Sequence, residues 1–349
     1  MRVAFTGATG NVGTSFVTAL AADPAVDGIV GIARRRPDVP LPAADLVTAD
    51  IAQDDLVPHL AGADVVIHLA WLIQPSHDRR VTAAVNVAGS RRVFEAAAAA
   101  GVGSIVYASS VGAYSPGPKD RRVGESWPTG GIPTSFYATD KAAVESLLDD
   151  FEAEHPGIRV VRLRPGLIFK REAASEIRRL FAGPFLPSPL VRPGLIPFVP
   201  ALERLRFQAV HADDAGEAYR LAALGDVRGA FNIAADPVLD PDALGRLLGA
   251  RPVPVDRRVL RAIVDLTWRA HLQPTPPGWL DMALAVPLLD TSRARQELGW
   301  TPRHRADDTL LELLDGIRRG DGAPTPPLTP GGAGPFRLRE LAGGVGRRS

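Results

Sequence analysis

Near its amino terminus the chain reads Val3-Ala4-Phe5-Thr6-Gly7-Ala8-Thr9-Gly10-Asn11-Val12-Gly13, a short apolar run that leads into three spaced glycines. The pattern predicts a buried strand, a glycine turn and the start of a helix. Gly7 permits the tight turn, Gly10 lets the backbone approach a pyrophosphate, and Gly13 lets the helix pack close to the strand. The N-terminus of the helix offers free N–H groups to phosphates. The motif therefore predicts a dinucleotide site, with a purely structural glycine turn as the alternative.

Short apolar runs continue to alternate with longer alanine-rich segments after this turn. Apolar strands separated by helices are typical of a parallel sheet that helices cover on both faces. The sequence therefore predicts an α/β fold with a doubly wound parallel sheet. The predicted strands span residues 3–6, 28–33, 45–48, 65–69, 104–109 and 158–163, and the helices between them 12–22, 54–61, 78–100 and 135–154.

The pattern becomes less regular after residue 165, and a proline-rich apolar stretch over 183–200 predicts an irregular loop. Further helices are expected around 213–224, 240–249, 256–270, 291–298 and 306–319, and a strand over 230–234 is expected to return to the main sheet. The last thirty residues are rich in glycine and proline, which predicts a flexible tail because such a segment buries little apolar surface. Docking of residues 336–341 on the body or on a partner subunit is the alternative. The predicted organisation is a dinucleotide-binding domain (1–165, with returns near 208–235), a smaller C-terminal substrate-binding region (166–207 and 236–319) and the tail (320–349).

Composition restricts the possible partners. The 349 residues include 40 Lys and Arg, 39 Asp and Glu, and no cysteine. A net charge of +1 gives no electrostatic support for a nucleic-acid or membrane partner. The seven histidines lack the spacing of metal ligands, so no metal is expected. No apolar run reaches the ~18 residues of a spanning helix, and a cytoplasmic protein is expected.

The second predicted strand ends at Ala33 and is followed by Arg34-Arg35-Arg36. An acidic residue at this point would bind the ribose 2′-hydroxyl of NAD, and none is present. Guanidinium groups suit a 2′-phosphate because they form bidentate, charge-assisted hydrogen bonds. The sequence therefore favours NADP(H) over NAD(H), with a solvated arginine run in a turn as the alternative.

A tyrosine and a lysine, Tyr137 and Lys141, lie four residues apart on the predicted helix 135–154. They share one helix face, although such a pair can also be a surface contact. An ammonium group nearby lowers the pKa of a tyrosine, which can then pass a proton to or from an alcohol or ketone oxygen. Ser109 and Ser110 follow the strand predicted over 104–109, and ligands of open α/β sheets bind at such strand ends.

In this order and at these distances, the glycine turn, the strand-end serine and the Tyr-xxx-Lys pair resemble the extended short-chain dehydrogenase/reductase family, which includes NAD(P)-dependent sugar epimerases and dehydratases. The resemblance covers about residues 1–319 and implies a Rossmann fold. It implies that Tyr137 is the catalytic acid/base and that Lys141 binds the nicotinamide ribose and lowers the pKa of Tyr137. It assigns the catalytic hydroxyl to Ser110, while the Ser109 hydroxyl is expected to bond backbone.

The resemblance also implies a homodimer through helices 78–100 and 135–154. Several further short motifs match the family's cofactor site, among them Asp50-Ile51 at the adenine and Asn86 at the start of a helix segment. The predicted cofactor site comprises Gly7, Thr9, Gly10, Asn11, Val12, Gly13, Arg34, Arg35, Asp50, Ile51, Leu69, Ala70, Asn86, Tyr137, Lys141, Pro165, Gly166 and Ile168.

The sequence departs from the family at positions that bind polar substrates. Val111-Gly112 stand where the dehydratases carry Asp-Glu, Leu167 stands where the epimerases carry asparagine, and Phe207 replaces an arginine that binds diphosphate, with Arg206 one step away. Burying a pyrophosphate against apolar groups is costly, so these changes predict an apolar substrate. The predicted pocket wall comprises Trp71, Val111, Tyr114, Leu167, Phe185, Phe198 and Phe207.

These observations favour an NADP(H)-dependent oxidoreductase that interconverts a ketone or aldehyde and an alcohol on a largely apolar small molecule. An NAD-dependent nucleotide-sugar epimerase is the first alternative. A non-catalytic NADP-binding sensor is the second.

Overall fold

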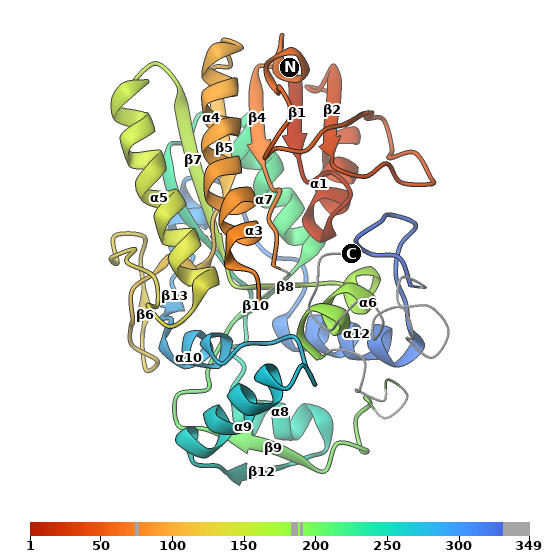
Figure 1. Cartoon of the computed structure of the whole chain (residues 1–349), viewed down its shortest axis with the longest axis vertical. Helices are drawn as coiled ribbons and strands as arrows, with labels where there is room; N and C mark the ends of the chain where they lie inside the picture. Colours follow the sequence, from red (N-terminus) through yellow and green to blue (C-terminus); the bar gives the residue numbers. More distant parts are fainter. Residues whose placement is uncertain (74–76, 183–187, 189–190, 331–349) are drawn as a thin grey trace.

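The computed structural model describes residues 1–73, 77–182, 188 and 191–330 (Figure 1). Its centre is a seven-stranded sheet in the order β11-β7-β5-β4-β1-β2-β3, and every strand pair in it is parallel. Strand order reverses between β1 and β4, which makes the carboxyl ends of these two strands the expected ligand site. The predicted doubly wound sheet is confirmed. The strands are β1 (Arg2–Thr6), β2 (Gly28–Ala33), β3 (Asp45–Thr48), β4 (Val65–His68), β5 (Ser104–Ala108), β7 (Arg159–Pro165) and β11 (Gly229–Ile233).

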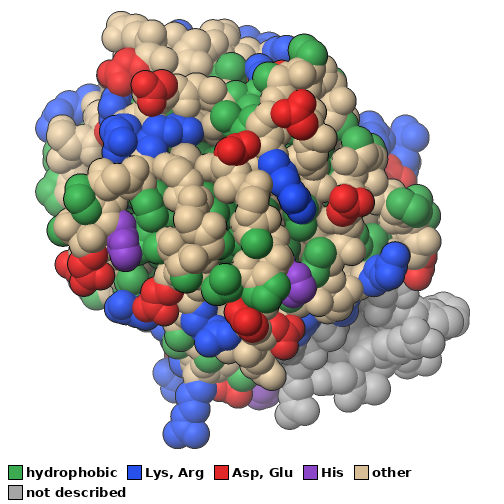
Figure 2. Space-filling model, turned by 90° about the horizontal axis from the view of Figure 1, so that it is seen from above, with side chains coloured by type: hydrophobic (Ala, Val, Ile, Leu, Met, Phe, Trp, Pro, Cys, Tyr) green, Lys and Arg blue, Asp and Glu red, His purple; other side chains and the backbone are tan. Residues whose placement is uncertain are grey.

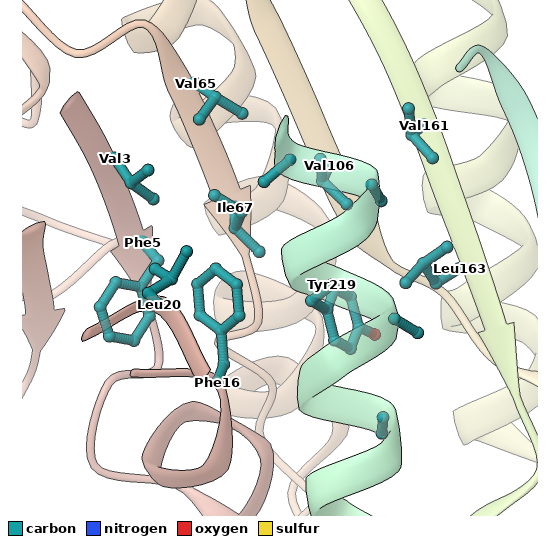
Figure 3. Close-up of a cluster of buried hydrophobic side chains, with 14 of the residues drawn as sticks. Val3, Phe5, Phe16, Leu20, Val65, Ile67, Val106, Val161, Leu163 and Tyr219 are labelled. Carbon is teal, nitrogen blue, oxygen red and sulfur yellow. The ribbon is translucent and has the colours of Figure 1, made fainter. Parts of the chain in front are cut away.

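Helices cover both faces of this sheet. On one face, the rings of Phe5, Phe16 and Tyr219 pack edge to face between β1, α1 and α7, and small alanines on α7 let that helix lie close to the strands (Figure 3). On the other face, Phe94 of α4 meets Phe151 of α5. The helices around the sheet are α1 (Asn11–Ala21), α2 (Val57–Leu60), α3 (Arg79–Ala83), α4 (Gly89–Ala99), α5 (Phe136–Glu154) and α7 (Ala212–Leu224).

The helix predicted over 78–100 is divided in the structure. Asp78 caps α3 by accepting a hydrogen bond from the N–H of Arg80. A π-helical turn, η1 (Ala84–Ala88), then separates α3 from α4. Such turns frequently mark functional positions, and this one contains Asn86.

A second lobe lies below the carboxyl ends of the strands (Figure 1). Its short strands pair in parallel across long stretches of sequence: β8 (Leu167–Phe169) with β10 (Ala209–His211), β9 (Phe198–Ala201) with β12 (Arg251–Pro254), and β13 (Leu288–Leu289) with β6 (Arg122–Val123). The remaining helices are α6 (Ala174–Ile177), α8 (Pro241–Leu248), α9 (Arg257–Arg269), α10 (Gly278–Ala285), α11 (Ser292–Gln296) and α12 (Ala306–Arg319), with short turns η2 (Val111–Ala113), η3 (Arg171–Ala173) and η4 (Arg178–Ala182). The sequence did not predict α10 or these strand pairs, whereas the return of β11 to the sheet is confirmed.

The prediction of a flexible tail from residue 320 is wrong for its first part. The hydroxyl of Ser175 donates to the carbonyl of Asp321 at 2.7 Å, and a guanidinium nitrogen of Arg179 donates to the carbonyl of Pro327 at 2.7 Å. Leu328 is fully buried. Residues 320–330 therefore dock beside α6, and residues 331–349, including the alternative docking segment 336–341, lie outside the described part of the chain.

None of the helices in the described ranges is both long and apolar enough to cross a membrane.

Candidate active site

The glycine turn brings three strand ends together. Gly7 has a φ of +78°, and a Cβ added there would lie 2.8 Å from the backbone nitrogen of Ala70, so only glycine fits. Its N–H donates to the carbonyl of Ile32 at 2.9 Å. α1 begins at Asn11, and within the described residues no side chain caps its first N–H groups. This cradle fits a phosphate group, because uncapped N–H groups and the helix dipole both favour an anion.

The other predicted cofactor residues also lie at the carboxyl edge of the sheet. Arg34 and Arg35 follow β2 directly and are partly buried. The amide nitrogen of Asn11 donates to the carbonyl of Ile168 at 3.1 Å, while its buried Oδ1 has no partner among the described residues. A dinucleotide would offer such an acceptor a hydroxyl or amide donor. The remaining positions are the turn residues Thr9, Gly10, Val12 and Gly13, Asp50 and Ile51 after β3, Leu69 and Ala70 after β4, Pro165 ending β7, and Gly166 beyond it.

Asn86 holds the loop after β4. Its Nδ2 donates to the carbonyl of Leu72 at 2.9 Å, and its Oδ1 accepts from the N–H of Leu72 at 2.8 Å. The hydroxyl of Ser90 donates to the carbonyl of Asn86 at 2.5 Å and also lies 2.9 Å from Nε2 of His68. Both side-chain groups of Asn86 are therefore occupied by the protein, so its contribution to a cofactor site is to position backbone.

His68 is a buried histidine whose two ring nitrogens contact Thr6 and Ser90. Burial, together with the charge of Lys141, lowers the pKa of His68 to about 3. In the unfolded chain His68 is therefore protonated below pH ~6.5, whereas in the folded protein it stays neutral down to about pH 3. The stability from this group is complete above the unfolded pKa and is lost as the pH falls through that window.

We expect the free energy of unfolding to fall by about 2 kcal/mol between pH 7 and pH 5 through this histidine alone. Urea denaturation at several pH values measures it. His68→Gln has no titrating group at this position, so its stability should depend less steeply on pH than that of the parent protein. Equal slopes for the two proteins would contradict the assignment.

Tyr137 and Ser110 meet at the end of β5. Ser135 caps α5 by accepting from the N–H of Ala138, which places Tyr137 in the first turn of that helix. Ser110 lies close enough to Tyr137 to lower the pKa of its hydroxyl. The Ser110 hydroxyl also accepts from the N–H of Gly112 at 3.0 Å, and a Cβ at Gly112 would lie 2.9 Å from Cε1 of Tyr137. The tyrosine ring therefore packs against the backbone that follows Ser110.

Lys141 is almost fully buried one turn later on α5. Its ammonium donates to the carbonyl of Ala108 at 2.6 Å and to the hydroxyl of Tyr107 at 3.4 Å, and it lies 3.4 Å from the ring centroid of Trp71. The centroid of the Tyr137 ring is farther away, at 5.9 Å. Burial lowers the pKa of Lys141 well below its usual range.

The expectation that Lys141 lowers the pKa of Tyr137 is not met in this structure. Burial raises the pKa of Tyr137, and the hydrogen bond with Ser110 opposes that rise. The reason is that the lysine ammonium is directed to Ala108 and Tyr107 rather than to the tyrosine hydroxyl. Tyr137 therefore carries its proton at neutral pH, which is the state required of an acid that protonates a carbonyl oxygen.

A buried ion pair between Glu145 and Arg164, which the sequence did not reveal, lies near Lys141. Glu145 lies one turn after Lys141, and both of its carboxylate oxygens accept from Arg164, at 2.8 and 2.9 Å. The Ser109 hydroxyl donates to Glu145 at 2.5 Å, so this hydroxyl bonds a carboxylate and not backbone as expected. Hydrogen bonds from Arg164 and Ser109 hold the pKa of Glu145 below its usual range despite burial. The spacing Tyr137–Lys141–Glu145 was the only sequence signal for this pair.

Aromatic and apolar side chains surround Tyr137. The Trp71 ring meets it edge on, with centroids 5.8 Å apart, and the Trp279 ring lies at 4.8 Å. Phe181 packs against the far side of Trp279 at 4.9 Å. The same cluster contains Val111, Ile132, Met282 and Val286. Two predicted wall residues, Trp71 and Val111, are thus brought to Tyr137, while Trp279, Phe181 and Met282 were not in the predicted wall.

The structure does not bring Tyr114, Leu167, Phe198 or Phe207 into the cluster around Tyr137. Tyr114 is fully buried, and its hydroxyl donates to Asn232 at 2.7 Å and accepts from Arg164 at 3.1 Å. Phe207 packs in a separate cluster with Leu239. Phe198 is 61% exposed on β9. Leu167 is partly exposed at the start of β8, and Phe185 lies outside the described residues.

Three cations gather beside this region. Lys119 donates to the carbonyls of Arg206 and Ala283, at 2.7 and 2.9 Å, and Arg206 returns a bond to the carbonyl of Lys119. Burial, followed by the charges of Arg204 and Arg206, lowers the pKa of Lys119 to about 7. Within the described residues these three side chains form no ion pair with a carboxylate.

Comparison with known proteins identifies the family. The model of the NAD dependent epimerase/dehydratase family matches residues 3–182, which are 180 of the 349 residues. The chain is 33% identical over 190 residues to L-arabinose 1-dehydrogenase (NAD(P)(+)) of Haloferax volcanii, in an alignment covering 51% of this chain and 70% of that protein. It is also 30% identical over 321 residues to an uncharacterized protein of Mycobacterium tuberculosis. That alignment covers 91% of this chain, and the chain spans 30% of the length of this longer relative.

Solved structures agree on the fold. The chain is similar to UDP-glucose 4-epimerase of Thermotoga maritima, with a TM-score of 0.68 and 20% identity over 91% of this chain and 99% of that one. At this identity the likeness shows the fold alone. Together with the match over half of the sequence, it supports one conclusion. The chain belongs to the NAD dependent epimerase/dehydratase family, the NAD(P)-dependent extended short-chain dehydrogenases/reductases.

Proposed function

We propose that this chain is an NADP(H)-dependent oxidoreductase that interconverts a ketone or aldehyde and an alcohol on a largely apolar small molecule. The observation that carries the proposal is the setting of Tyr137, a protonated tyrosine whose ring contacts two indole rings and whose pKa is lowered by the neighbouring Ser110 against the effect of burial. Burying a diphosphate against Trp71, Trp279 and Met282 would leave its charge unpaired. Burying a hydrocarbon there is favourable, because apolar surface is removed from water.

In this proposal each polar side chain has a separate task. Bound nicotinamide would supply the hydride to a carbonyl carbon, or accept it from an alcohol. Ser110 orients the carbonyl oxygen by hydrogen bonding. The hydroxyl of Tyr137 gives its proton to that oxygen, or takes it back in the reverse direction. Lys141 binds the ribose of the nicotinamide.

Arg34 and Arg35 support NADP(H) as the cofactor. They follow β2, whose last residues lie beside the glycine turn through the hydrogen bond from Gly7 to Ile32. We expect the double variant Arg34→Gln/Arg35→Gln to weaken NADPH binding by about tenfold or more, because charge-assisted hydrogen bonds to the 2′-phosphate are lost. NADH binding should change little.

Fluorescence titration with both cofactors measures the effect. The exposed neighbour Arg36 provides a control, since Arg36→Gln removes one positive charge from the same turn. If the double variant loses NADPH and NADH affinity to the same extent, or retains both, the arginines do not select the cofactor.

An NAD-dependent nucleotide-sugar epimerase is the second candidate, and the basic residues Lys119, Arg204 and Arg206 favour it because no carboxylate among the described residues forms an ion pair with them. A purified protein that retains NAD and epimerises a UDP- or dTDP-sugar would establish it over the oxidoreductase. A non-catalytic NADP sensor is the third candidate. It requires NADPH binding with no turnover over a broad panel of carbonyl compounds.

A homodimer through α3, α4 and α5 stays a prediction, and sedimentation equilibrium tests it. A small-molecule carbonyl or alcohol is the partner that the proposed chemistry requires.

A further inference from the structure

The second lobe exposes an apolar helix face. α9 places Val259, Ile263 and Leu266 at the spacing of one helix face, and their side chains are 55%, 52% and 69% exposed. No residue of α9 is fully buried. Leu272, just beyond the helix, is 49% exposed. Adjacent exposed aliphatic side chains on a soluble lobe indicate an interaction site.

Exposed apolar groups are unevenly distributed over the molecule. Of the nine large hydrophobic side chains that are exposed in the described part of the chain, two lie outside the second lobe (Met1 and Val39), and seven lie in it: Leu167, Leu195, Phe198, Val259, Ile263, Leu266 and Leu272. The opposite end of the molecule shows acidic, basic and hydrophobic side chains interspersed (Figure 2). The apolar surface therefore concentrates where α9, β9 and β12 lie in Figure 1.

Basic residues border this face. α9 carries four arginines against one aspartate, Asp265, which pairs with Arg269 at 3.0 Å. Arg257 and Arg261 share the carboxylate of Asp281 on α10. Arg258 forms no ion pair with any of the described residues, and it precedes Val259 directly. An apolar stripe edged by arginine is the pattern of helices that lie in a lipid–water interface, where the stripe enters the acyl region and the cations meet anionic head groups.

The inner side of α9 is tied to the candidate active site. Arg261 donates to Asp281 of α10 at 3.0 Å, and α10 carries Trp279. The Trp268 ring stacks on His77 with centroids 4.3 Å apart, which links α9 to the segment that follows Trp71. A surface that receives α9 would thus lie beside the two indole rings that flank Tyr137.

We propose that α9 is a peripheral membrane-docking helix, which inserts Val259, Ile263 and Leu266 into a bilayer surface that contains anionic lipid. This occupant is favoured over a protein because the face is purely aliphatic and its border is cationic. The net charge of the whole chain is only +1, so it does not reveal the local excess of arginine on α9. Docking would hold the candidate active site next to the lipid phase, in which an apolar substrate dissolves. Only this consequence rests on the proposed function; the docking itself does not.

Cosedimentation of the full-length protein with vesicles tests the proposal without any substrate. We expect binding to phosphatidylcholine vesicles that contain phosphatidylglycerol, weaker binding at high salt, and weaker binding to phosphatidylcholine alone. Leu266→Ser should lower the partition coefficient by about tenfold or more, and Arg258→Glu by about fivefold or more. Val39→Ser removes an exposed valine far from α9 in the sequence and should leave binding unchanged.

Two results would overturn the proposal. One is the absence of a role for α9 in vesicle binding: either the parent protein does not bind the anionic vesicles, or the α9 variants bind them as well as the parent does. The other is a change of oligomeric state in Leu266→Ser, measured by sedimentation equilibrium without lipid, because a second copy of the chain would then cover the face. A parent protein that does not bind the anionic vesicles but still turns over soluble carbonyl compounds would reject docking alone, so this outcome is separable from failure of the proposed function.

Discussion

Replacing Tyr137 with phenylalanine is expected to lower kcat by about a hundredfold to ten-thousandfold while the affinity for NADPH stays within a small factor. The hydroxyl is the atom that exchanges the proton with the substrate oxygen, and the ring alone supplies the packing against Trp71 and Trp279. Steady-state rates of NADPH oxidation measure kcat, and fluorescence titration measures the cofactor affinity.

The matched control for this variant is Tyr219→Phe. Tyr219 is a buried tyrosine on α7, packed against Phe16 on the face of the sheet that carries α1. Removal of the Tyr219 hydroxyl should leave kcat unchanged. Full turnover in Tyr137→Phe would remove the tyrosine from the mechanism, and equal losses in both variants would indicate a folding defect.

Replacing Glu145 with alanine is expected to lower the free energy of unfolding by about 3–5 kcal/mol, because it leaves the Arg164 guanidinium buried without its charge partner. Ser109 loses its acceptor in the same change. Urea denaturation measures the loss. Asp149→Ala serves as the control: this exposed carboxylate also bonds a buried arginine, Arg162, at 2.8 Å, and its removal should cost less than about 1 kcal/mol.

A double variant separates the charge effect from packing. Glu145→Leu/Arg164→Met removes both charges and keeps apolar volume, so it should recover most of the stability lost by the single variant. A loss below about 1 kcal/mol in Glu145→Ala would show that the pair is not desolvated as its contacts indicate.

The sequence predicted the central sheet well because its elements are defined by local patterns. The bounds predicted for β2 and β3 match those observed, and the glycine turn is required locally by the approach of Gly7 to Ala70. The residues proposed as catalytic also have a local sequence signal, since Tyr137 and Lys141 are four residues apart and Ser110 follows a strand. Their proximity in space follows from strand order.

The side chains around Tyr137 were predicted poorly because their arrangement depends on packing between distant segments. Trp279 reaches Tyr137 from α10, a helix that follows several prolines and was not expected. The hydroxyl of Tyr114 donates to Asn232, which is far away in the sequence, and this bond holds the Tyr114 ring in the interior. The pKa of Tyr137 was predicted with the wrong direction, because spacing along a helix shows neither burial nor where a lysine ammonium points.

The most direct test of the proposed function is the rate of NADPH oxidation with a homologous series of ketones and aldehydes of increasing hydrocarbon length. If the indole-lined site binds apolar carbonyl compounds, kcat/KM rises by about fourfold for each added methylene until the site is filled, and NADH is the poorer cofactor. A flat or falling series, together with turnover of a nucleotide-sugar by protein that retains NAD, would contradict the oxidoreductase and establish the epimerase.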